Sequence, residues 1–182
     1  MAKVIEGLVI DQYTGLGYLP VHSSLVASDQ EAYLILGASQ SGKTTFANKL
    51  QAEQFEVLSD DITFVGINDV VGMGHYIKRY SLKEQNGTVE HFQGTYREVV
   101  KISRPASIVQ INKIFYMELS TMDFREEEIL DKQDKLQRMI AYLHLFPNEY
   151  FISRQISYTL LIEISKRLAN ISTLLVTNKY LS

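Results

Sequence analysis

The segment GASQSGKT, from position 37 to 44, limits most strongly what this chain can fold into. An apolar run, AYLIL, enters the first glycine, and the segment after the second glycine places its apolar residues on one helical face from Thr44 to Ala52. Glycine permits backbone conformations that other residues avoid, so the chain can turn sharply there. The pattern therefore predicts a buried strand, a tight loop and a helix in direct succession.

This loop has the chemistry of a phosphate-binding site, because it matches G-x-x-x-x-G-K-[ST] in full. Bare backbone amides and the positive end of the following helix would face an anion. Lys43 would reach the β- and γ-phosphates, and the Thr44 hydroxyl would bind Mg²⁺. The flanking patterns disfavour a chance match on a Gly/Ser turn. The predicted nucleotide-binding residues are Gly37, Ala38, Ser39, Gln40, Ser41, Gly42, Lys43, Thr44 and Thr45.

A pair of aspartates, Asp60 and Asp61, follows a short apolar run just beyond the predicted helix. FEVLSDDITFVGI reads as two strand pieces flanking the pair. One carboxylate at such a strand end could hold Mg²⁺, and the other could accept a proton from an attacking hydroxyl. Most Asp pairs are solvated turns or helix caps, but the position after the loop favours a functional pair. The residues do not show which aspartate has which role.

Composition places the chain among single globular domains and excludes several classes. The 182 residues, taken as one domain from 1 to 182, include 46% hydrophobic and 21% charged residues. A net charge of -3 argues against a general nucleic-acid binder, and the absence of cysteine excludes disulfides and thiolate metal sites. Glu6 and Asp11 interrupt the first apolar residues, unlike a signal peptide, and no stretch is long enough for a membrane span. We therefore expect a cytoplasmic protein with no nucleic-acid or membrane partner.

The rest of the chain predicts further strands and helices around a mixed sheet. We expect one strand at 21–27, a core strand at 107–119 and a final strand at 171–177. Helices are predicted at 124–146, where Arg125 to Glu128 would form an acidic first turn, and at 152–170. The Gly-rich, polar segment 68–107 has no clear periodicity.

The order of these features resembles the catalytic domain of the HPr kinase/phosphorylase family over 22–65, about a quarter of the chain. That family places a His on the strand before the loop, then an apolar strand, the loop, a helix and an Asp-Asp pair. ATP-dependent phosphoenolpyruvate carboxykinases have a similar core. The resemblance implies an α/β fold with a P-loop core of this type, a mixed sheet and flanking helices. It also implies ATP and Mg²⁺ as cofactors.

Four residues take on catalytic roles through this resemblance. His22 matches the family's active-site His, and Lys43 the phosphate-binding lysine. Asp60 and Asp61 match the acidic pair that supplies the base and a metal contact, with Thr44 as the metal-binding hydroxyl. From the residues alone, His22 could equally be an ordinary strand histidine near the surface.

The chain also departs from this family. The second signature, with Glu, Arg and glycines, is not reproduced: VKISRPASIVQI has Arg104 before a strand but lacks the glycines. The reverse phosphorylase reaction and HPr as substrate therefore stay open. The chain more closely resembles short HPr-kinase-like proteins, some of which act in peptide-modification clusters such as those for lasso peptides. Family members form oligomers, which leaves a homo-oligomer open.

The combined interpretation is an ATP- and Mg²⁺-dependent kinase that phosphorylates a hydroxyl, most simply a serine, of a protein or peptide. A non-catalytic ATP-binding module and a small-molecule kinase are the alternatives. DVVG and TNKY are only superficially similar to GTPase motifs, and the second lacks the aspartate that reads guanine. A basic loop with His75, Lys78 and Arg79, and the arginines Arg97 and Arg104, are secondary candidates for phosphate or substrate contacts.

Overall fold

The computed structural model describes residues 2–72, 76–81, 89–92, 95–101, 107–120, 125–129, 131–145 and 157–179. Its helices are α1 (Ala2–Gly15), α2 (Lys43–Ala52), α3 (Lys132–Leu145) and α4 (Tyr158–Leu168). Its strands are β1 (Leu19–His22), β2 (Ser24–Ala27), β3 (Ala32–Gly37), β4 (Glu56–Ser59), β5 (Ile62–Val65), β6 (Val70–Gly72), β7 (Tyr76–Ser81), β8 (Val89–Phe92), β9 (Thr95–Lys101), β10 (Ser107–Val109), β11 (Lys113–Ser120), β12 (Arg125–Glu128) and β13 (Ser172–Lys179). The mixed α/β class predicted from the sequence is confirmed.

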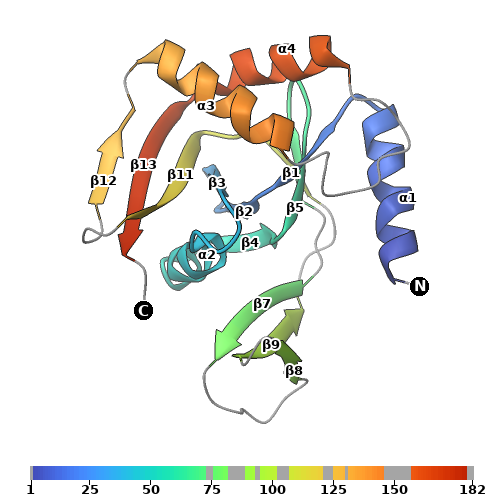
Figure 1. Ribbon diagram of the computed structural model, residues 1–182, viewed down its shortest axis with the longest axis vertical. Helices are drawn as coiled ribbons and strands as arrows, with labels where there is room; N and C mark the ends of the chain where they lie inside the picture. The colour runs from blue at the N-terminus through green and yellow to red at the C-terminus, as the bar shows by residue number, and fades with distance from the viewer. Residues whose placement is uncertain are drawn as a thin grey trace.

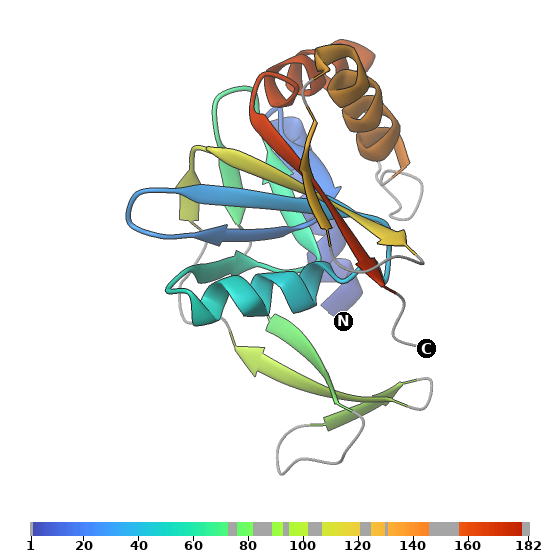
Figure 2. The same ribbon diagram turned by 90° about the vertical axis from the view of Figure 1, so that its left-hand side faces the viewer.

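A six-stranded mixed sheet forms the centre of the molecule, in the order β12-β13-β11-β3-β2-β4. The strands β3, β11 and β13 run parallel, and β2 and β12 run antiparallel to their neighbours. Helix α2 covers one face, and α3 and α4 cover the other (Figure 1, Figure 2). Alternate residues of β3 serve the two faces: Leu34 and Leu36 pack in the α3/α4 core, and Tyr33 and Ile35 pack beside α2. A strand buried on both faces explains the unbroken apolar run before the loop.

A second, antiparallel sheet has the order β1-β5-β6-β10, and α1 packs against it. Ile10 of α1 is buried with Phe64 and Val71, and the Tyr13 ring stacks on Phe64 with centroids 4.3 Å apart. No helix was predicted for this N-terminal segment. Only a few apolar residues of α1 pack on the sheet, so they form no distinct helical pattern in the sequence.

The chain crosses between these two sheets at two adjacent points. Strands β1 and β2 are separated by Ser23 alone, and β4 and β5 by Asp60 and Asp61. His22 pairs with Ile62 in the second sheet, and Leu25 pairs with Ser59 in the first. The aspartate pair therefore lies where a paired set of strands changes sheets, directly opposite Ser23 and Ser24.

The remaining strands correct several sequence predictions. The strand expected at 21–27 is broken at Ser23, and the one expected at 107–119 is two strands, β10 and β11, in different sheets. Arg125–Glu128 is strand β12 and not the first turn of a helix, because it pairs antiparallel with β13.

The third sheet, β7-β9-β8, lies below α2 in Figure 1. None of the helices in the described part of the chain is long and apolar enough to span a membrane.

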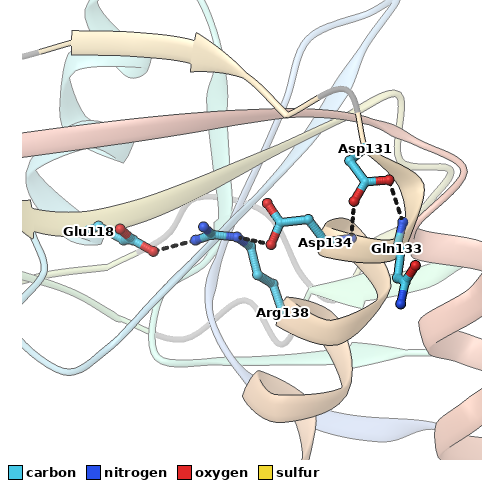
Figure 3. A network of polar contacts seen from close by, with 5 residues as sticks. All are labelled: Glu118, Asp131, Gln133, Asp134 and Arg138. Carbon is cyan, nitrogen blue, oxygen red and sulfur yellow. Dashed lines mark hydrogen bonds and ion pairs between the residues drawn. The ribbon is translucent and has the colours of Figure 1, made fainter.

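Helix α3 begins after Asp131, which caps it and so starts it later than predicted. The Asp131 carboxylate accepts hydrogen bonds from the backbone N–H groups of Gln133, at 3.2 Å, and Asp134, at 3.1 Å (Figure 3). One turn on, Arg138 donates to Asp134 at 2.9 Å and to Glu118 of β11. Burial alone would lower the pKa of Arg138, but its bonds to Asp134 and Glu118 outweigh burial and raise that pKa. These contacts hold α3 against the end of β11.

We expect Asp131→Ala to lower the free energy of unfolding by about 1 kcal/mol, because two N–H groups of the first turn lose their acceptor. Asp131→Asn keeps a capping oxygen and should change stability much less. Urea denaturation of the three proteins gives both values. Equal losses in the two variants would show that the hydrogen bonds to the cap contribute little.

Candidate nucleotide and metal site

The glycine loop lies between β3 and α2, as the sequence predicts. Gly37 ends β3 with φ +150°, and Gln40 and Gly42 have φ of +65° and +94°. Ala38, Ser39 and Gln40 are exposed, and Ser41 N–H closes the turn by donating to the Ala38 carbonyl at 3.2 Å. Gly42 is the N-cap of α2 and provides no side-chain acceptor for the first turn of that helix. A helix start of this kind suits an anion, because its N–H groups need an outside acceptor.

Lys43 is the first residue of α2 and folds back over the loop. Its ammonium donates to the carbonyl oxygens of Gly37 and Ala38, both at 2.8 Å, and the side chain is buried. The charge therefore lies within the curve of the loop, where a bound phosphate would sit. The neighbouring Ser41 hydroxyl is 1% exposed and has no hydrogen-bond partner within the described residues. Thr45, also predicted to bind nucleotide, is exposed on α2.

Thr44 and Asp60 are brought together at the end of the loop. The Thr44 hydroxyl donates to the two oxygens of the Asp60 carboxylate, at 3.0 and 3.1 Å. The Ser24 hydroxyl of β2 also donates to Oδ1 of Asp60, at 2.6 Å. Asp60 is 8% exposed, so its charge depends on these donors. The structure thus brings the loop hydroxyl together with one carboxylate of the aspartate pair.

Asp61 differs from Asp60 in both backbone and exposure. Its φ of +89° lies in a region that residues other than glycine seldom occupy, and it is less buried than Asp60. Strained backbone of this kind occurs often at functional sites. Two neighbouring carboxylates therefore have different surroundings, a distinction that the sequence alone did not provide.

The donor set at the end of the loop is a hydroxyl and a carboxylate, oxygen ligands of the kind that magnesium takes. Within the described residues, no group of three or more His, Cys, Asp or Glu side chains could hold a metal ion. Mg²⁺ is usually held by one or two carboxylates, water and substrate phosphates. Because the Thr44 hydroxyl donates its hydrogen bond to Asp60, the lone pairs of its oxygen are available to a cation, so these residues fit a Mg²⁺–nucleotide.

His22 ends β1 close to the aspartate pair, since it pairs with Ile62, the residue after Asp61. Its backbone carbonyl accepts a hydrogen bond from the Tyr142 hydroxyl of α3, which also lies 2.5 Å from the Gly37 carbonyl. Tyr142 is buried. One side chain of α3 therefore joins the end of β1 to the start of the glycine loop.

We expect Tyr142→Phe to lower the free energy of unfolding by about 1 to 3 kcal/mol, because buried carbonyls lose a donor while the ring is kept. Tyr33→Phe is the matched control, since the Tyr33 hydroxyl donates to the exposed Glu31 and water can replace it. Chemical denaturation compares the two. A loss in Tyr142→Phe no larger than in Tyr33→Phe would contradict this role of the hydroxyl.

The secondary candidates fall on strands β7 and β9 or outside the described residues. Lys78 and Arg79 lie in strand β7, so the basic loop predicted there is wrong, and Arg97 lies in β9. His75 and Arg104 lie outside the described residues. Ser24 and Tyr142 were not predicted as site residues. Their neighbours in the fold, Asp60 and Gly37, are far away in the sequence, so no local motif marks them.

No protein-family model and no curated protein matches this chain. Among solved structures, the chain is similar to the Hpr(Ser) kinase/phosphatase from Coxiella burnetii. The sequences are 15% identical, the alignment covers 61% of this chain and 72% of that chain, and the TM-score is 0.36. A similarity of this degree supports no argument about activity, which has to come from the site itself.

Proposed function

We propose that this protein is an ATP- and Mg²⁺-dependent kinase that transfers the γ-phosphate to a hydroxyl group. The observation that supports this most is the contact between Thr44, at the end of a full phosphate-loop motif, and the buried carboxylate of Asp60. A hydroxyl and a carboxylate in this place are the protein ligands that a magnesium–nucleotide needs.

The loop and α2 would bind the nucleotide phosphates. Residues 38 to 42 curve around the anion, the first turn of α2 presents its N–H groups, and Lys43 neutralises charge on the β- and γ-phosphates. Thr44 and Asp60 would hold Mg²⁺, which when bound draws electron density from the phosphate oxygens. Most of the rate acceleration would then come from positioning and charge neutralisation.

Asp61 is the better candidate for the base, because it is less buried than Asp60, whose carboxylate accepts hydrogen bonds from Thr44 and Ser24. In the transfer, a lone pair of the acceptor oxygen forms a bond to the γ-phosphorus. The bond from that phosphorus to the bridging oxygen breaks, and its electrons leave on ADP. The hydroxyl proton passes to the Asp61 carboxylate. His22 lies beside this pair and could orient either the carboxylate or the acceptor.

The acceptor class rests on the sequence resemblance, which implies a serine of a protein or peptide. A small-molecule acceptor and a non-catalytic nucleotide-binding role make different predictions. A small-molecule kinase would phosphorylate metabolites but not peptides. A binding module would hold ATP tightly without transferring its phosphate.

Incubation with γ-labelled ATP and Mg²⁺, alone and with an extract of the source cells, tests the proposal. We expect label on a discrete protein or peptide, and its loss in Lys43→Met. Lys49→Met is the control, because Lys49 is exposed at the other end of α2. ATP binding without transfer or hydrolysis under all metals and extracts would contradict a kinase and favour the binding module.

A further inference from the structure

Four hydroxyl side chains lie where the chain passes between the two sheets beside Asp60, three on strands β2, β4 and β5 and one between β1 and β2. Ser23, Ser24, Ser59 and Thr63 are all buried, at 1% exposure or less. They gather where the paired strands pass from one sheet to the other. Buried hydroxyls are nearly always hydrogen-bonded. The partner of each hydroxyl therefore indicates whether it supports the backbone or a side chain of the site.

Three of these hydroxyls form hydrogen bonds with other residues at the crossing between the sheets. Ser59 and Thr63 bond each other at 2.7 Å, and Ser23 donates to the Val21 carbonyl at 3.3 Å. Ser24 differs, because its hydroxyl donates to Oδ1 of Asp60 at 2.6 Å. Short hydrogen bonds to a carboxylate are about twice as strong as those between neutral groups.

Ser24 also lies on a rigid support. It belongs to β2, which pairs with β3 on one side and β4 on the other, and Ser24 itself pairs with Ile35. β3 leads into the glycine loop and β4 leads into Asp60. The Ser24 hydroxyl therefore lies on a strand that is paired on both sides with the strands leading into the glycine loop and into Asp60.

We propose that Ser24 is a positioning residue that fixes the Asp60 carboxylate for a magnesium–nucleotide, an assignment that rests on the proposed function. The Ser24 bond holds Oδ1, so the carboxylate keeps the orientation in which Thr44 reaches both of its oxygens. Without the Ser24 hydroxyl, Oδ1 of Asp60 loses its shortest hydrogen bond, and we expect the carboxylate to hold this orientation less firmly. Hydrogen bonds to metal-binding carboxylates commonly affect metal affinity in this way.

The test compares Ser24→Ala with Ser23→Ala, two neighbouring buried serines of which only the first donates to Asp60. Titration calorimetry measures the binding of ADP with and without Mg²⁺, so no turnover is involved. We expect Ser24→Ala to weaken magnesium-dependent ADP binding by about tenfold or more. Without metal, Ser24→Ala should bind ADP within about twofold of wild type. Ser23→Ala should bind ADP within about twofold of wild type both with and without Mg²⁺.

A second pair of variants tests the same hydroxyl if Ser24→Ala fails to fold. The side chains introduced in Ser24→Thr and Ser24→Val have nearly the same shape and differ in the hydroxyl, so we expect Ser24→Thr to bind Mg²⁺–ADP more tightly than Ser24→Val. If Ser24→Ala bound Mg²⁺–ADP as tightly as Ser23→Ala, and Ser24→Val as tightly as Ser24→Thr, while the wild-type protein bound it normally, the role of Ser24 would be overturned. The proposed function would then still stand. A folded wild-type protein that binds no Mg²⁺–nucleotide would overturn the proposed function and this assignment with it.

Discussion

Asp61→Gly should greatly slow phosphate transfer while it raises the free energy of unfolding. Glycine adopts the observed φ of +89° without the steric cost that aspartate has there. Relief of that strain should add about 0.5 to 1 kcal/mol to stability. Loss of the base should slow transfer by about 10² to 10⁴-fold. A variant that is more stable but inactive is typical of a strained catalytic position.

Two further variants separate the strain from the chemistry. Asp61→Asn keeps a side chain of the same shape, so transfer should fall as in Asp61→Gly with little gain in stability. Gln54→Gly relieves a φ of +74° in the exposed turn after α2, so stability should rise with transfer unchanged. Thermal unfolding and single-turnover transfer provide both readouts. Transfer that persists in Asp61→Asn would rule out Asp61 as the base.

Gly37→Ala should give the largest loss of stability among single substitutions at the loop. A Cβ at this position would lie 2.6 Å from the Met117 carbonyl oxygen and 2.5 Å from the Ser41 hydroxyl. Met117 belongs to β11, which pairs with β3 at Gly37, so the backbone cannot easily move away. Overpacking and backbone strain together should cost about 2 to 6 kcal/mol. Denaturant unfolding measures the loss.

Gly17→Ala is the control for backbone strain without a clash. Gly17 has φ +87°, and a Cβ there would meet nothing within 4 Å. We expect it to lose about 1 to 2 kcal/mol from the left-handed conformation alone. If Gly37→Ala cost no more than Gly17→Ala, the close approach of β11 to the loop would not be what requires glycine at position 37.

The features that could be predicted from the sequence depend on residues near one another in the chain. β3, the glycine loop and α2 are continuous, and each conformation follows from the periodicity of its own residues. The strand pieces on either side of Asp60 and Asp61 were predicted for the same reason. Arg125–Glu128 was not, because four polar residues resemble a helix start until β13 provides a strand to pair with.

The sequence by itself determined the strand, loop and helix around Lys43 and the presence of an acidic pair after them. Only the tertiary structure decided which carboxylate contacts Thr44, because Asp60 and Asp61 look alike in the chain and differ only at the crossing between two sheets. It also decided that Ser24 and Tyr142 belong to the site. Strand pairing and helix packing bring distant residues together, and such contacts leave no local pattern in the sequence.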